Sequence, residues 1–185
     1  MNQTSIEQPA EEQYHYRKKW SGILVGILLI CLCAQITINV GDIPITGQTL
    51  AVLAVALIFQ PIDTIIIVSS YLLVGAIGLP VFADGSAGWE KLTGGSGGFL
   101  IGFLVASVVV SYLFHQKGGK EIISIIGFTA LGTIIILIFG ISKLAYSFGL
   151  DKALEYGFYP FWKGAIIKVL LGSFLVRGFY NIKAN

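Results

Sequence analysis

Six apolar segments run through the sequence and are separated by more polar connections. They cover residues 20–40, 49–60, 62–78, 98–115, 122–148 and 162–179. A helix needs about 20 mostly apolar residues to cross the hydrocarbon core of a bilayer. Most of the segments approach that length, and the second, which is closed by Pro61, is short. The pattern predicts an all-α integral membrane protein with six transmembrane helices.

Composition supports this prediction and excludes other classes. Charged residues make up 12% of the chain and hydrophobic residues 55%, whereas a soluble domain carries about 25% charged residues. A net charge of +2 leaves no concentrated basic face, which argues against a nucleic acid partner. No internal repeat is visible in the 185 residues, so the inverted-repeat architecture of many transporters is not expected.

Arginine and lysine are unevenly divided between the two sides that six crossings would create. Seven lie on the side of both termini: Arg17, Lys18, Lys19, Lys117, Lys120, Arg177 and Lys183. Four lie on the other side: Lys91, Lys143, Lys152 and Lys163. Because basic residues favour the cytoplasmic side, we expect both termini to be cytoplasmic. Residues 1–19 then form a polar cytoplasmic tail, expected to be disordered, and residues 20–185 a six-helix substrate-binding membrane domain.

The longer connections, 41–48, 79–97 and 149–161, fall on the predicted outer side. Binding residues are often carried by loops on a rigid scaffold, so we expect a site beneath them. The connection 79–97 is rich in glycine, and glycine allows tight turns and a close approach to a ligand. A flexible lid is therefore expected there.

Motifs for enzymatic chemistry are absent from the sequence. The pair Gly119-Lys120 is followed by Glu121, so it fails the phosphate-binding pattern G-x-x-x-x-G-K-[ST]. Cys31 and Cys33 lie within the first apolar segment, far in sequence from both histidines, so no metal site is predicted. We expect neither an enzyme nor a bound cofactor.

Lys168 is the most informative charge, because it falls inside the sixth apolar segment. A charge at membrane depth costs about 2.5–3.5 kcal/mol. Phe161, Ala165 and Gly172 share its helical face through their spacing of three and four residues. The four residues predict a shallow trough in which the amine binds a ligand carboxylate. Alternatively, Lys168 extends to the membrane interface or pairs with an acid of the protein.

Three ordered motifs resemble a known family. Residues 43–53, IPITGQTLAVL, resemble its P-x-T-x-Q-T-L segment, and residues 71–83, YLLVGAIGLPVFA, resemble its Y-L-x-x-G-x-x-G-x-P-V-F-A segment. Residues 94–103, GGSGGFLIGF, are similar to its G-P-T-G-G-Y-x-x-G-F loop, with Gly95 in place of proline. The family is BioY, the substrate-binding S components of biotin transporters of the energy-coupling factor (ECF) type.

The resemblance implies a six-helix S component in the bacterial plasma membrane, surrounded by lipid, that captures biotin with high affinity from outside the cell. Uptake would be driven by a transmembrane coupling subunit and two ATPase subunits. The motif positions imply polar ligand contacts by Thr46, Gln48, Asp84 and Ser96. Small residues on the first helix contact the coupling subunit in this family, which implies that role for Gly22 and Gly26.

The sixth helix departs from the family pattern P-F-x-x-G-D-x-x-K. The chain keeps Pro160, Phe161, Gly164 and Lys168 but has Ala165 at the aspartate position. A missing carboxylate leaves a buried ligand N–H without an acceptor, which costs about 1–3 kcal/mol. An S component for a related carboxylate without such donors, for example lipoate, is therefore an alternative. Two further alternatives are a membrane assembly protein that binds no ligand and a facilitator that transports without partner subunits.

Overall fold

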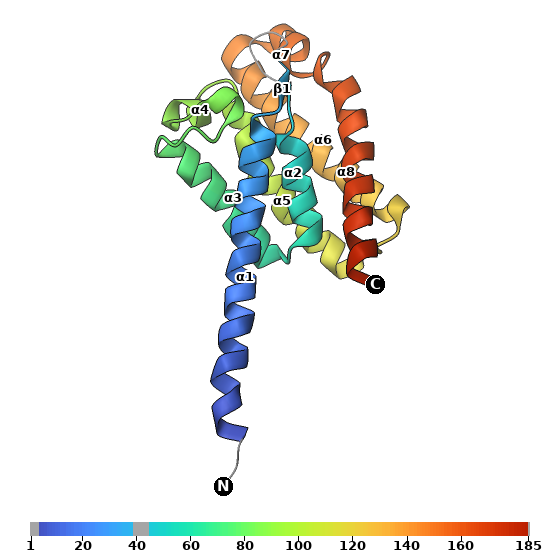
Figure 1. Cartoon of the computed structure of the whole chain (residues 1–185). Coiled ribbons are helices and arrows are strands. Elements are labelled where there is room, and N and C mark those ends of the chain that lie inside the picture. The colour runs from blue at the N-terminus through green and yellow to red at the C-terminus, as the bar shows by residue number, and fades with distance from the viewer. Residues whose placement is uncertain (1–3, 39–44, 185) are drawn as a thin grey trace.

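The computed structural model describes residues 4–38 and 45–184 and is mostly helical (Figure 1). In chain order its elements are α1 (Thr4–Ala34), β1 (Thr37–Ile38), β2 (Ile45–Thr46), α2 (Gln48–Ile58), α3 (Pro61–Ala76), the 3-10 turn η1 (Ala83–Gly85), α4 (Trp89–Thr93), α5 (Gly97–Lys117), α6 (Ile122–Phe148), α7 (Leu150–Gly157) and α8 (Phe161–Ala184).

The long helices coincide with the predicted apolar segments. The bounds of α6 match the prediction, and α2, α3, α5 and α8 each begin within one residue of it. Three helical stretches are long and apolar enough to cross a membrane, namely Gly97–Lys117, Ile122–Phe148 and Gly164–Lys183. The stretches Lys19–Ala34, Gln48–Ile58 and Pro61–Ala76 are apolar but shorter. The structure is mostly helical, as predicted, and the six crossings stay a prediction.

Two predictions for the N-terminal region were wrong. The tail expected to be disordered is helical from Thr4, because its glutamate, glutamine, lysine and arginine residues favour a helix that continues into the apolar part of α1. The first apolar segment does not stay helical to residue 40. The helix α1 ends at Ala34, and β1 pairs antiparallel with β2, with Thr37 opposite Thr46. Residues 39 and 40 lie outside the described residues.

The helix α2 occupies the centre of the bundle. Every residue from Ala51 to Leu57 is buried, and α2 contacts α1, α3, α5, α6 and α8. Its 11 residues span only about 16 Å, too short for a helix that faces lipid along its length. Because α2 is surrounded by protein, its length is not set by the bilayer.

Glycines bring α5 and α6 into close contact. A Cβ added at Gly102 would lie 3.1 Å from the Ile136 Cα, and one added at Gly98 would lie 3.1 Å from the Gly140 Cα. Small residues at such positions let helix backbones approach closely. This packing fixes the wall of the bundle that carries the candidate site.

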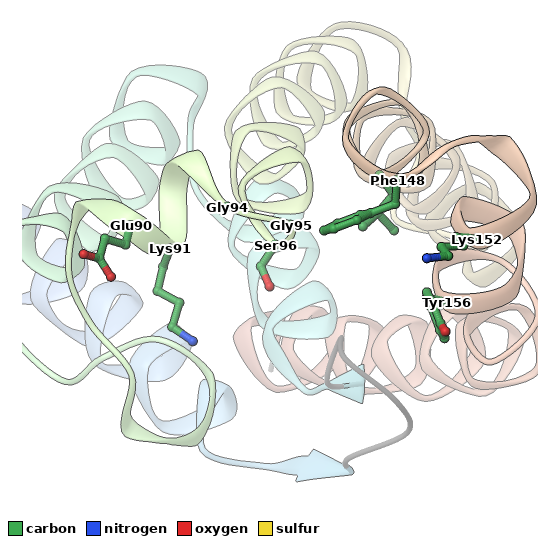
Figure 2. Close-up of a pocket in the computed structure, with 9 residues that line it drawn as sticks. Glu90, Lys91, Gly94, Gly95, Ser96, Phe148, Lys152 and Tyr156 are labelled. Atoms are coloured by element: carbon green, nitrogen blue, oxygen red, sulfur yellow. The ribbon is translucent and has the colours of Figure 1, made fainter.

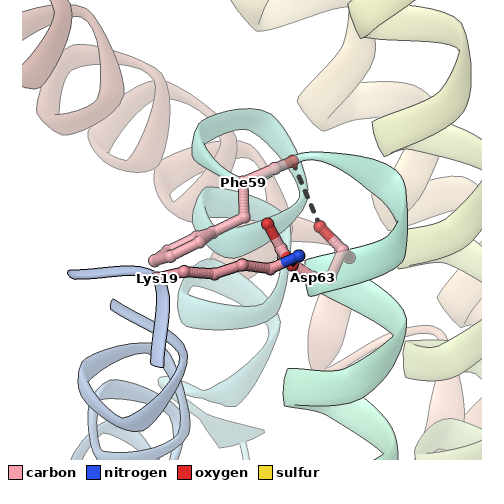
Figure 3. A network of polar contacts seen from close by, with 4 residues as sticks. Lys19, Phe59 and Asp63 are labelled. Carbon is pink, nitrogen blue, oxygen red and sulfur yellow. Dashed lines mark hydrogen bonds and ion pairs between the residues drawn. The ribbon is translucent and has the colours of Figure 1, made fainter. Parts of the chain in front are cut away.

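The two ends of the bundle differ. The β-hairpin, η1, α4 and α7 lie at one end, which we call the loop end, whereas α8 terminates at the other (Figure 1). Near the opposite end the Lys19 amine lies 3.1 Å from the Asp63 carboxylate (Figure 3). Beside this pair the Thr64 hydroxyl donates to the Phe59 carbonyl at 3.2 Å. The ion pair ties α1 to the first turn of α3, and the hydrogen bond braces the turn between α2 and α3.

Candidate functional site

Two of the cavities formed by the described residues contain residues that the sequence predicted for the site. The first, which we call the loop-end cleft, has a volume of about 490 Å³ and is lined by Glu90, Lys91, Gly94, Gly95, Ser96, Leu144, Phe148, Lys152 and Tyr156. The second, which we call the Lys168 cavity, has a volume of about 20 Å³ and is lined by Thr49, Phe99, Thr133, Ile136, Leu137, Phe161, Ala165 and Lys168. Small-molecule sites commonly have volumes of about 300–1,000 Å³, so of these two cavities the loop-end cleft has that size and the Lys168 cavity does not.

The loop-end cleft carries an excess of positive charge. Lys91 on α4 and Lys152 on α7 lie on opposite sides of it, whereas the Glu90 carboxylate points away from its middle (Figure 2). The apolar part of its wall comes from Leu144 and Phe148 near the end of α6. Both lysines are exposed, so their attraction for an anion is screened by solvent and salt.

The Lys168 cavity is small and mostly apolar. Phe99 of α5 and Phe161 of α8 stack beside it, with ring centroids 5.4 Å apart and an interplanar angle of 18°. A volume of about 20 Å³ holds roughly one water molecule. Lys168 is half-buried, and no ion pair or hydrogen bond of its amine occurs among the residues that the structure describes. Within the described residues, this arrangement places a cation without an ionic or hydrogen-bonding partner in the wall of a small, mostly apolar space.

The structure brings some of the predicted trough together. Phe161, Ala165 and Lys168 line the same cavity, as their spacing predicted. Gly172 lies farther along α8 and outside that cavity, where a Cβ would lie 3.3 Å from Leu50 Cγ. Gly172 therefore allows α8 to pack closely against α2. Binding of a ligand by Lys168 stays a prediction.

Thr46 and Gln48 belong to a buried polar network and line neither cavity. The Thr46 hydroxyl donates to Gln48 Oε1 at 2.9 Å, and the Gln48 amide donates to the Tyr71 hydroxyl. The Tyr71 hydroxyl in turn donates to the Val81 carbonyl at 3.3 Å. This network joins the hairpin, α2 and α3 to the segment that follows α3.

Asp84 and Ser96 lie at the loop end but in different surroundings. Asp84 accepts a hydrogen bond from the Thr37 hydroxyl, so it fastens η1 to β1. Its neighbours are held as well, because Gln35 donates to the Phe82 carbonyl at 3.2 Å and accepts from the Gly85 amide at 3.0 Å. Ser96 lines the loop-end cleft. The first half of the expected lid is therefore anchored to the bundle.

Gly22 and Gly26 serve packing within the chain. A Cβ added at Gly26 would lie 2.7 Å from Ile67 Cδ1 on α3, and one added at Gly22 would lie 3.4 Å from Phe59 Cε1. The pair thus lets α1 approach α3 and the turn before it. A contact of these glycines with a partner subunit stays a prediction.

Sequence reasoning missed the far walls of both cavities. Lys91 and Lys152 line the loop-end cleft, and Thr49 and Thr133 line the Lys168 cavity. One signal was available for Thr133, because a polar residue within a transmembrane segment that faces the bundle interior often belongs to a functional site. Lys91, Lys152 and Thr49 could not be found in this way, because their place in a cavity wall depends on which helices pack against one another.

Comparison with known proteins identifies the family. The model of the BioY family matches residues 8–185 of the chain. The chain belongs to the BioY family. Biotin transporter BioY2 of Lactococcus lactis subsp. cremoris is 37% identical over 80% of this BioY chain and 82% of its own length. Biotin transporter BioY of Thermotoga maritima is 33% identical, over 80% of this chain and 86% of its own length.

A solved structure shows the same fold as this BioY chain. It is the S-component for biotin from an ECF-type ABC transporter, and the two superpose with a TM-score of 0.83, covering 91% of this chain and 93% of the other at 21% identity. The resemblance inferred from the three motifs is confirmed. This BioY chain is a multi-pass protein of the plasma membrane that acts in transport and is not an enzyme.

Proposed function

We propose that the chain captures biotin from outside the cell as the S component of an ECF-type transporter. The relatives reported above are named as biotin transporters, and their alignments cover most of its length. The observation that carries the proposal within the molecule is the unpaired amine of Lys168 in the wall of an aromatic-lined cavity. In the bound state this amine donates a hydrogen bond to an oxygen of biotin.

The proposed orientation in the membrane has six crossings, by α1, α2, α3, α5, α6 and α8, with both termini in the cytoplasm. Residues 1–19 then form a cytoplasmic extension, and residues 20–185 form the binding domain. The unequal distribution of basic residues supports this orientation. It places the loop-end cleft at the outer surface, where the substrate arrives.

Biotin enters through the loop-end cleft, whose volume of about 490 Å³ is in the range of small-molecule sites. Phe99 and Phe161 then move apart and the Lys168 cavity opens into the cleft. Phe161 and Ala165 contact apolar parts of the ligand, and Ser96 provides a polar contact from the cleft. Gly172, Thr46, Gln48 and Asp84 act indirectly, because they hold the helices and loops that form the walls.

The proposed partners are a transmembrane coupling subunit and two ATPase subunits. The sequence has no phosphate-binding loop of its own, so another chain must supply the energy from ATP. The fold match to the S-component of an ECF-type ABC transporter supports the same arrangement. Gly22 and Gly26 contribute to the coupling interface by setting the position of α1 in the bundle.

The alternatives are not favoured. The relatives reported above are named for biotin and not for lipoate. An assembly protein without a ligand leaves the placement of Lys168 unexplained, because the amine has no acidic partner in residues 4–38 and 45–184 to offset its burial.

Equilibrium binding of labelled biotin to the purified protein tests the proposal. We expect Lys168→Met to weaken binding at least about tenfold, because a hydrogen bond to a charged group contributes about 1.5–3 kcal/mol. Lys143→Met is the matched control, since Lys143 lines neither cavity. Thermal shifts with biotin, lipoate, thiamine and riboflavin give an independent measure, because a ligand that binds only the folded form raises its melting temperature. Absence of biotin binding by the native protein would refute the proposal.

A further inference from the structure

In the proposed complex, the Lys168 cavity opens around only one end of biotin. Lys168 and Ala165 line the same space of about 20 Å³, whereas the ureido ring and the carboxylate lie at opposite ends of the biotin molecule. The carboxylate is charged and costly to desolvate, and the loop-end cleft offers it two exposed lysines. The neutral ureido group costs less to place in the apolar cavity.

A bound ureido group requires both a donor and acceptors from the protein. Its carbonyl oxygen accepts a hydrogen bond, and its two N–H groups donate. The Lys168 amine is a donor without acceptor capacity, so it is suited to the carbonyl. Ala165 contributes no acceptor. The remaining side-chain hydroxyls in the cavity wall belong to Thr49 and Thr133.

Thr133 is oriented as an acceptor. Its hydroxyl donates to the Thr129 carbonyl at 2.9 Å, so its single proton is used within α6 and its oxygen lone pairs stay free. The residue is 7% exposed. Within the described residues, no donor is bonded to this oxygen.

Thr129, one turn away on the same helix, shows the contrast. Its hydroxyl also donates within the helix, to the Ile125 carbonyl at 2.8 Å. Its oxygen, however, accepts a hydrogen bond from the Ser173 hydroxyl at 3.3 Å, and Thr129 does not line the cavity. Both threonine hydroxyls donate to the carbonyl four residues earlier in α6. Of the two, only Thr133 has an acceptor oxygen without a bonded donor and also lines the cavity.

We propose that the Thr133 hydroxyl oxygen accepts a ureido N–H of biotin, in place of the carboxylate that the chain lacks at residue 165, while Lys168 donates to the ureido carbonyl. This inference rests on the proposed function. It makes Thr133 a specificity-determining residue, because ligands that lack an N–H donor leave its lone pairs unused. It also places the biotin carboxylate in the loop-end cleft, between Lys91 and Lys152.

Binding of biotin to Thr133→Val and Thr133→Ser tests the inference. Valine keeps the shape of threonine and removes the acceptor, so we expect affinity to fall about tenfold or more, on the order expected for a buried N–H left unpaired. Serine keeps the oxygen, and its affinity is expected to stay within about threefold of the native value. Desthiobiotin, which retains both ureido N–H groups, should show the same losses.

Thr129→Val is the control for a structural effect. It removes an equivalent hydroxyl from the same helix, and we expect it to lower the melting temperature without a tenfold loss of biotin affinity. Folding of each variant is checked by its melting temperature without ligand. If the native protein binds biotin and Thr133→Val binds it equally well, the inference is wrong. If the native protein does not bind biotin, the proposed function itself fails.

Discussion

The loop-end cleft and the Lys168 cavity are built from different kinds of structure. The cleft is bordered by the short helices α4 and α7 and carries exposed lysines, whereas the Lys168 cavity is enclosed by α2, α5, α6 and α8. The cleft has room for a ligand, whereas the Lys168 cavity, beside which the rings of Phe99 and Phe161 stack, holds roughly one water molecule. If biotin binds as proposed, charge acts on it in the exposed cleft, and shape and hydrogen bonds act on it in the more apolar Lys168 cavity.

The largest expected effect comes from overfilling the contact between α6 and Phe99, which lines the Lys168 cavity. Gly140 of α6 is buried against the ring of Phe99. We expect Gly140→Leu to destabilise the protein by about 1–3 kcal/mol. We also expect it to abolish detectable biotin binding, because the leucine side chain would displace the ring of Phe99. Melting temperature and equilibrium binding measure the two effects. Gly127→Leu on the same helix is the control, since no atom lies within 4 Å of a Cβ built there. Equal behaviour of the two variants would contradict this account of the wall.

A smaller effect is expected from adding a carboxylate to the Lys168 cavity. Ala165→Asp supplies a strong acceptor beside Lys168, so we expect biotin affinity to rise by about tenfold, consistent with a charge-assisted hydrogen bond. In the presence of Asp at residue 165, Thr133→Val should cause little further loss of biotin affinity, because the ureido N–H then has another acceptor. Titration calorimetry on both single variants and the double variant measures this coupling. A weaker affinity in Ala165→Asp would show that the acid pairs with Lys168 at the ligand's expense.

The smallest effect is expected in the cleft. Lys152→Gln removes one of two solvent-exposed charges, so we expect only a two- to fivefold loss of biotin affinity, on the order of an exposed ion pair. The loss should appear mainly in the association rate and should shrink as salt is raised. Biotin methyl ester, which lacks the charge, should bind the variant and the native protein alike. An equal loss for the ester would place the carboxylate elsewhere.

Much of the fold was predictable because hydropathy marks helices that meet lipid. The bounds of α6 follow from a long, predominantly apolar segment. The end of α1 was not predictable in this way, because residues 36–38 are apolar or β-branched and their strand depends on pairing with Ile45 and Thr46. The amphipathic helix α7 was also missed, since its apolar residues alternate with charged ones.

The candidate site was predictable only along a single helix. The spacing of Phe161, Ala165 and Lys168 places them on one face of α8 whatever surrounds that helix, and all three line one cavity. The opposite walls come from α2, α5 and α6. The local sequence pattern does not predict that these helices pack against α8. Gln48 illustrates the same limit, because its motif position suggested a ligand contact and its amide instead bonds Tyr71.

The central position of α2 also bears on how the protein is made. A helix of 11 residues is too short to partition into a bilayer by itself as it leaves the ribosome. It is joined to α3 through a turn at Pro61, so the two are expected to enter the membrane together as a helical hairpin. Biosynthesis would then hold α2 beside α3 until the later helices arrive to enclose it.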